Sequence, residues 1–71
     1  MQQQPTEMIL IVEDSDSDYE TVLTAFRDGG MVNPVERCTD GDDALDYLFR
    51  RGQYASLAEQ PLPGLILLDL N

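Results

Sequence analysis

The architecture of this chain follows from residues 8–14, Met-Ile-Leu-Ile-Val-Glu-Asp, where a continuous apolar run stops at two adjacent acids. A short, partly β-branched run of this kind is typical of a strand that is buried on both faces of a parallel sheet. A second such run, Leu65-Ile-Leu-Leu68, ends at Asp69. We therefore expect two buried strands, each with an acid at its carboxyl end.

Two amphipathic helices are predicted between these strands. Ser17-Asp-Tyr-Glu20 has the pattern of a capping box, and Gly29-Gly30 supplies a left-handed stop for the first helix. The second helix is predicted to open at Asp40-Gly-Asp-Asp43 and to end at Arg50-Arg51-Gly52. We interpret their apolar stripes as core: Tyr19, Val22, Leu23 and Phe26 in the first helix, and Ala44, Leu45, Leu48 and Phe49 in the second.

The remaining segments complete a β-α-β-α-β order. Residues 32–38 are a weaker strand candidate, which Pro34 favours placing at an edge. Residues 53–64 contain two prolines and are predicted to form a long loop, with a short turn around residues 56–59. Right-handed crossovers would make the sheet parallel. Residues 1–7 are polar and predicted to be a disordered lead-in, so residues 8–71 form the predicted domain.

Composition excludes several kinds of chemistry. The 71 residues include 14 acids and 4 basic residues, all arginine, for a formal net charge of −10, and there is no histidine or lysine. A lysine Schiff base, a histidine base, a Ser-His-Asp triad and a His-ligated metal are thereby excluded within this chain. The negative charge argues against a nucleic-acid partner, because phosphate binding needs clustered Lys and Arg.

Cys38 and the length of the apolar runs indicate in which cellular compartment the protein is expected. A single cysteine cannot form an internal disulfide, and we interpret Cys38 as a small buried thiol. No apolar run approaches the length of a membrane helix. We therefore expect a cytoplasmic protein with no membrane contact.

The acids at the strand ends form the candidate site. The carboxyl ends of parallel strands meet at one edge, so Asp14 and Asp69 converge there if the first and third strands are neighbours. With Glu13, three carboxylates would repel one another, which favours raised pKa values or a bound divalent cation. Mg²⁺ suits such a site, and an Asp beside it can attack phosphorus to give an aspartyl-phosphate.

These motifs resemble the amino-terminal half of response-regulator receiver domains. The matching pieces are residues 9–14, the Asp40-Gly41 turn with Ala44-Leu45, and residues 65–71, so that the resemblance covers residues 8–71. It implies half of a flavodoxin-like, doubly wound parallel sheet, in an α/β fold whose strand order comes with the resemblance. The segment that includes Arg51-Gly-Gln-Tyr54 is similar to the phytochrome-associated receivers.

The resemblance also implies roles for individual residues. Asp69 would be the phospho-acceptor for a sensor histidine kinase, in a signalling domain that is not itself an enzyme. Asp14 and Asp69 would bind Mg²⁺ through their carboxylates. Asn71 would bind the ion through its backbone carbonyl, and Glu13 would act mainly through water.

The family pattern continues beyond Asn71. Two further strands and three further helices carry a Ser or Thr and a Lys that contact the phosphoryl group. This chain has no lysine, and Asn71 is its last residue, so the carbonyl of Asn71 belongs to a terminal carboxyl group. We expect these 71 residues alone to be inactive or severely impaired as a phosphoryl acceptor.

Two alternatives stay open. The pattern Asp14-x-Asp16-x-Asp18 matches the opening of a calcium loop, although Tyr19 stands where Gly is needed and Ala25 where Glu is needed. Without such a loop, Asp16 and Asp18 are acids that interact with the helix dipole.

The second alternative is an assembly module. Without a fourth strand, the third strand would be an exposed apolar edge, which is a template for pairing with another chain. The chain would then form a homo-oligomer through its third strands or recruit a complementary half-domain.

Overall fold

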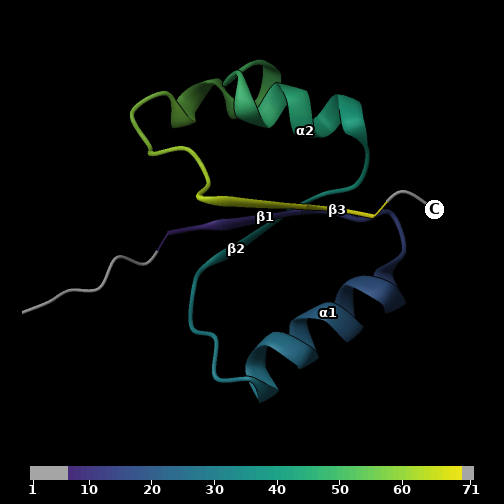
Figure 1. Ribbon diagram of the computed structural model, residues 1–71. Helices are drawn as coiled ribbons and strands as arrows, with labels where there is room; N and C mark the ends of the chain where they lie inside the picture. The colour runs from purple at the N-terminus through teal and green to yellow at the C-terminus, as the bar shows by residue number, and fades with distance from the viewer. Residues whose placement is uncertain (1–6, 70–71) are drawn as a thin grey trace, which may run out of the picture.

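The computed structural model describes residues 7–69. The proposed metal ligand Asn71 and all but the last residue of the predicted lead-in therefore lie outside the described residues. The elements follow the predicted order (Figure 1). They are β1 (Ile9–Val12), α1 (Asp16–Asp28), β2 (Val35–Cys38), α2 (Gly41–Leu48), the 3₁₀ helix η1 (Gly52–Leu57) and β3 (Leu65–Leu68).

The sheet is parallel, with the strand order β2-β1-β3. Ile9 of the central strand β1 lies opposite Val35 of β2 and Leu65 of β3, and the register continues without a break. Helix α1 covers one face of the sheet and helix α2 the other (Figure 1). The first and third strands are therefore neighbours, as the site prediction required, and their carboxyl ends lie at one edge.

The core lies between β1, β2 and α2. All four residues of β1 are buried, and Leu10, Cys38 and Tyr47 are the largest side chains that are fully enclosed. The Tyr47 hydroxyl donates a hydrogen bond to the Met8 sulfur at 3.2 Å. The Tyr47 ring meets the Tyr54 ring edge-on, with centroids 5.0 Å apart. This packing confirms the prediction that Cys38 is buried.

The apolar stripes of the helices are only partly as predicted. In α1 the four predicted residues are half-buried, and no residue of the helix is fully buried. In α2 the prediction was wrong for Leu45 and Phe49, which are 46% and 65% exposed, whereas Tyr47 is 1% exposed. Because α2 ends at Leu48, Phe49 falls at its C-cap and points out of the core.

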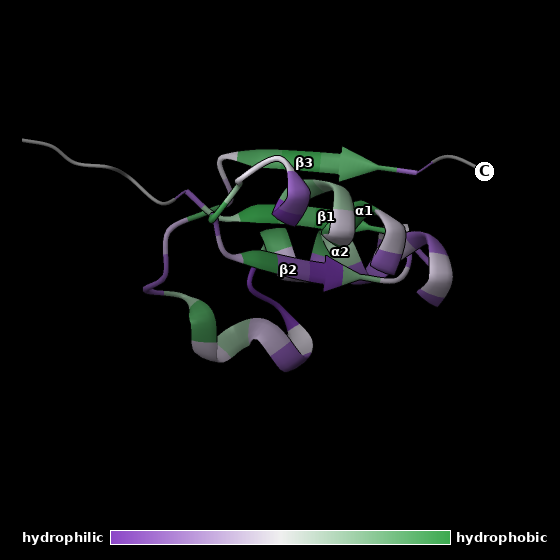
Figure 2. Cartoon of the chain, turned by 90° about the horizontal axis from the view of Figure 1, so that it is seen from below, coloured by the Kyte–Doolittle hydropathy of each residue, from purple (hydrophilic) through white to green (hydrophobic). Residues whose placement is uncertain are grey.

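Strand β3 forms as predicted but is not buried. Leu65, Ile66 and Leu68 are 48%, 41% and 60% exposed. The strand pairs with β1 alone within the described part of the chain, and it forms an edge that is apolar over its whole length (Figure 2). An apolar run predicts a buried strand only if both faces are covered, and here the cover of β3 is incomplete.

The predicted loop over residues 53–64 also contains more structure than expected. The 3₁₀ helix η1 begins at Gly52, where Arg50 and Gly52 adopt positive φ angles of 55° and 57°. The Arg50 guanidinium then donates hydrogen bonds to the carbonyls of Gln60 and Pro61 at 3.1 and 3.0 Å. Among residues 7–69, no helix has the length and apolar character to cross a membrane.

Candidate functional site

The candidate site lies at the carboxyl edge of the sheet, where β1 and β3 end side by side. Glu13 follows β1, and its amide donates a hydrogen bond to the carbonyl of Cys38 at 2.9 Å. Asp69 follows β3, and its amide donates to the carbonyl of Val12 at 3.2 Å. Both acids are therefore held by extensions of the parallel ladder.

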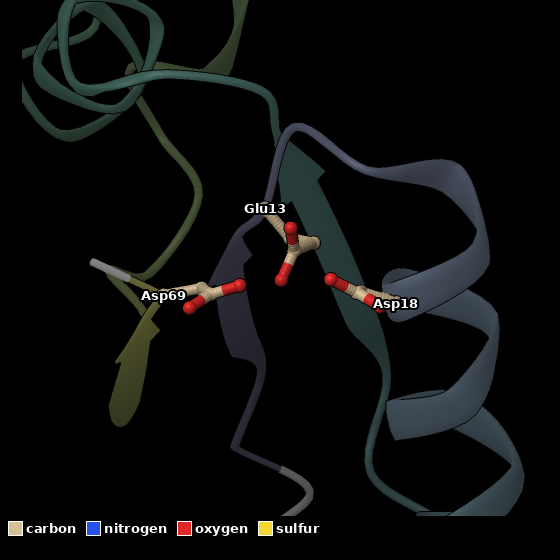
Figure 3. Close-up of side chains that lie close together, drawn as sticks. All are labelled: Glu13, Asp18 and Asp69. Carbon is tan, nitrogen blue, oxygen red and sulfur yellow. The ribbon is translucent and has the colours of Figure 1, made fainter. Parts of the chain in front are cut away.

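Three carboxylates converge at this edge. Glu13, Asp18 and Asp69 each place one carboxylate oxygen within 4.8 Å of the other two. Figure 3 shows the Glu13 side chain between the other two, with Asp18 reaching across from the first turn of α1. Glu13 is buried at 4% exposure, whereas Asp18 and Asp69 are exposed. The group thus has one enclosed acid and two that face solvent.

Asp14 does not belong to this group, contrary to the predicted convergence of Asp14 with Asp69. Its side chain is exposed, and the set of converging acids has Glu13 in its place. β1 ends at Val12, and Asp14 lies in a bend between the strand and α1.

Asp18 reaches the site because helix α1 begins two residues earlier than the sequence indicated. Ser15, not Ser17, is the N-cap, and its hydroxyl accepts a hydrogen bond from the Asp18 amide at 3.2 Å. The amide of Ser15 in turn donates to a Glu13 carboxylate oxygen at 3.0 Å. Ser15-x-x-Asp18 also has the form of a capping pattern, which overlaps the one that begins at Ser17.

The calcium-loop alternative is wrong. Asp16 and Asp18 lie in the first turn of α1, directly after a strand. In a calcium loop of this type, these residues would lie in a loop, and a helix would precede that loop. Asp16 instead forms an ion pair with Arg37.

The electrostatics of the group favour a proton or a cation between the acids. A side-chain hydrogen bond with Asp69 raises the pKa of Glu13, and burial and the charges of Asp69 and Asp18 raise it further. The hydrogen bond from the Ser15 amide acts in the opposite direction and lowers the pKa. The net result is a pKa above the ordinary value, so ionised Glu13 is destabilised while its neighbours are charged.

A cavity of about 350 Å³ adjoins the acids. Its lining includes the three acids, Glu13, Asp18 and Asp69, and apolar residues such as Val22 of α1 and Leu67 of β3. Oxygen donors that lie this close together suit a hard cation, and the two exposed acids leave room for an ion that keeps several waters. The residues present therefore fit Mg²⁺.

Comparison with known proteins finds relatives of this chain, although no family model matches it. Response regulator Rcp1 of Synechocystis sp. is 36% identical over 94% of the chain and 44% of that protein. A probable methanogenesis regulatory protein of Methanothrix harundinacea is 34% identical over 90% of the chain and 39% of that protein.

Two solved structures give the same result. A response regulator in red light signaling of R. palustris is 31% identical and superimposes with a TM-score of 0.84 over 92% of the chain and 46% of its own length. A bacteriophytochrome response regulator is 40% identical, with a TM-score of 0.84 over 94% of the chain and 40% of its own length. This chain is a homologue of response regulators.

The resemblance inferred from the sequence is therefore confirmed. The three parallel strands and two helices match the flavodoxin-like receiver fold in part. The chain spans less than half the length of each relative and each structure that it matches. It corresponds to one portion of these longer proteins.

Proposed function

We propose that this chain is part of a receiver domain in which Asp69 accepts a phosphoryl group beside a Mg²⁺ ion. Glu13, Asp18 and Asp69 would hold the ion. The observation that carries the proposal is the convergence of these carboxylates at the carboxyl ends of neighbouring parallel strands. Homology to response regulators supports the same chemistry.

The residues of this chain can perform defined parts of that reaction. A carboxylate oxygen of Asp69 forms the bond to phosphorus, while the bond from phosphorus to the donor breaks and its electron pair leaves with the donor. Glu13 and Asp18 orient the site and supply negative charge that attracts a divalent cation. When bound, Mg²⁺ would neutralise charge on the transferred group.

The donor we propose is a sensor histidine kinase in the cytoplasm, with this chain acting as an acceptor and not as an enzyme. The phosphoryl-stabilising lysine that the resemblance implies is not in this chain, which contains no lysine. Loss of one positioned donor costs about 100- to 1000-fold in comparable sites. We therefore propose that these 71 residues alone accept phosphate slowly or not at all.

The ion site is tested by Mg²⁺ titration, followed by calorimetry, of the wild type and three variants. Asp69→Asn and Asp18→Asn should each weaken binding, because each removes an oxygen ligand from the group. Asp14→Asn is the matched control, since it removes the same charge from the neighbouring exposed position. It should weaken binding less.

Equal binding by the wild type and Asp69→Asn would contradict the proposal outright. A larger loss for Asp14→Asn than for Asp18→Asn would instead restore the ligand set that the resemblance implied. In that case the Asp14 side chain would have to turn toward Asp69 when the ion binds.

The exposed strand β3 favours a second candidate function, which is self-assembly. Leu65, Ile66 and Leu68 present an apolar edge, and the strand pairs on one side only among residues 7–69, so that its other side can pair with another strand. We propose in this case a homo-oligomer joined through β3, or a complex with a complementary half-domain. Association of this kind would survive Asp69→Asn, whereas Mg²⁺ binding would not.

A further inference from the structure

Arg37 lies in strand β2, yet its side chain reaches across to the turn that presents the acids. Its Nε donates a hydrogen bond to the backbone carbonyl of Glu13 at 3.0 Å. Its Nη1 lies 2.8 Å from a carboxylate oxygen of Asp16. Its guanidinium carbon lies 4.8 Å from the centre of the Tyr19 ring. One side chain thus contacts three residues of a seven-residue segment.

That segment carries two of the three acids of the site. Glu13 contributes both the carbonyl that Arg37 binds and the enclosed carboxylate of the group. Asp18 directly precedes Tyr19, whose ring lies against the guanidinium. Arg37 therefore links both ends of this segment, Glu13 after β1 and Tyr19 in α1, to strand β2.

Contacts that hold this segment in place are needed because the acids of the site repel one another. Glu13, Asp18 and Asp69 place their oxygens within 4.8 Å, and like charges at this distance push the helix start away from the strand ends. The guanidinium of Arg37 contacts the backbone carbonyl of Glu13, the Asp16 carboxylate and the Tyr19 ring. Arg37 therefore acts on the backbone at Glu13 and on the first turns of α1.

We propose that Arg37 is a positioning residue that holds Glu13 and Asp18 toward Asp69 and so sets the cation affinity of the site. The inference rests on the proposed function, because it assumes that the site binds a divalent cation. It assigns the effect to three contacts of different strength. Asp16 is 91% exposed, so its ion pair is screened by water and contributes little.

The hydrogen bond to the Glu13 carbonyl and the stacking on Tyr19 carry the larger share. Arg37 is only 22% exposed, so these contacts lie away from bulk water. Removing the ion pair alone, with Asp16→Asn, should therefore change the cation affinity less than Arg37→Ala does.

Simple charge attraction predicts the opposite sign. Arg37 is a cation near a cation site, so its removal would strengthen Mg²⁺ binding if only net charge mattered. Arg51→Ala is the matched control, because it removes the same charge and another arginine–aspartate pair, with Asp46 at 3.2 Å. Arg51 lies after α2, outside the group of acids and the turn that bears it.

The test is a Mg²⁺ titration of the full chain, with amide hydrogen exchange measured on the metal-free protein. Arg37→Ala should bind Mg²⁺ about tenfold more weakly than the wild type, the usual scale for residues that orient metal ligands. Arg51→Ala should bind as the wild type does or slightly more tightly. Equal affinities for Arg37→Ala and Arg51→Ala would overturn the inference.

Hydrogen exchange separates this inference from the proposed function. The amide of Ser15 donates to the Glu13 carboxylate, and its exchange should accelerate in Arg37→Ala but not in Arg51→Ala. If the wild type binds no Mg²⁺, the proposed function fails, and the assignment of Arg37 as the group that holds the turn is then decided by exchange alone. Unchanged Ser15 exchange overturns it.

Arg37→Lys is the second variant, for the case in which Arg37→Ala does not fold. Nη2 of Arg37 is buried with no hydrogen-bond partner among the described residues, and lysine removes this unpaired donor while it keeps the charge. A purely structural role predicts lower thermal stability with unchanged Mg²⁺ affinity. Our inference predicts weaker Mg²⁺ binding even where stability is kept, because lysine lacks the planar donor that binds the Glu13 carbonyl.

Discussion

Glu13 is the residue whose surroundings most affect the chemistry of the site. The resemblance implied that it acts mainly through water, whereas the structure encloses it at 4% exposure between Asp18 and Asp69. Its pKa is raised first by the hydrogen bond with Asp69 and then by burial. A proton on Glu13 and a cation bound at this position would each reduce the repulsion between the carboxylates of Glu13, Asp18 and Asp69. The proton and the cation should therefore compete.

Glu13→Gln should therefore stabilise the metal-free protein at neutral pH. A carboxyl whose pKa is raised on folding stabilises the native state below its ordinary value of 4.5, and this contribution is lost as the pH rises through the raised pKa. Glutamine mimics the protonated form at every pH. The thermal unfolding midpoint of Glu13→Gln should exceed that of the wild type at neutral pH, with a smaller difference in acid.

Glu20→Gln is the control for this comparison, because it removes the same charge from an exposed position of α1. An equal rise of the midpoint in both variants would show that only the net charge of −10 matters. The site-specific account would then be wrong at Glu13.

The pKa of the Cys38 thiol is raised from 9.0 to about 11, chiefly by burial. The folded protein keeps this proton over a range in which the unfolded chain loses it, so stability should fall as the pH rises from 9 to 11. Subtracting the thermal midpoints of Cys38→Ala from those of the wild type isolates this contribution. A difference that stays constant over this range would contradict it.

At the scale of elements, the helix caps show which helix starts could be predicted from the sequence. Asp40 was predicted to open α2, and its side chain does accept the Asp43 amide at 2.8 Å. For α1, two overlapping cap patterns compete, and the structure uses Ser15. The choice could not be made from the sequence, because it depends on the hydrogen bond between the Ser15 amide and Glu13.

Ser15→Ala and Ser17→Ala test this assignment directly. Loss of an N-cap hydroxyl costs about 1 kcal/mol, and Ser15 is the residue whose hydroxyl accepts the Asp18 amide. Urea unfolding should show a cost of that order for Ser15→Ala and a smaller one for Ser17→Ala. The reverse ranking would move the cap back to the position that the sequence suggested.

The strands show which part of the site could be predicted. Apolar runs that end in acids were enough to place Glu13 and Asp69 at one edge of a parallel sheet. They could not decide between Glu13 and Asp14, because both acids follow the end of β1, in the connection to α1. The exposure of β3 could not be predicted from the sequence either, because it depends on which elements cover the strand and not on the residues of the strand itself.

At the scale of the whole molecule, a net charge of −10 and an apolar edge act against each other. Charge repulsion opposes association and is screened by salt, whereas the open edge of β3 favours it. Light scattering should therefore show a mass that rises with protein and salt concentration.

Ile66→Lys should suppress this association, because a charge on an edge strand blocks pairing. Leu62→Lys is the control, since Leu62 is 61% exposed but lies outside β3. A monomer mass that does not change with concentration in the wild type would remove the assembly candidate.

The central claim, that Asp69 accepts a phosphoryl group with Mg²⁺ at the acidic edge, is tested most directly by intact-mass spectrometry. The chain is joined to the C-terminal part of a receiver domain and incubated with acetyl phosphate and Mg²⁺. Our account predicts that the wild type gains the mass of one phosphoryl group, that the gain requires Mg²⁺, and that Asp69→Asn gains nothing. No gain in the wild type, or an equal gain in Asp69→Asn, would contradict it.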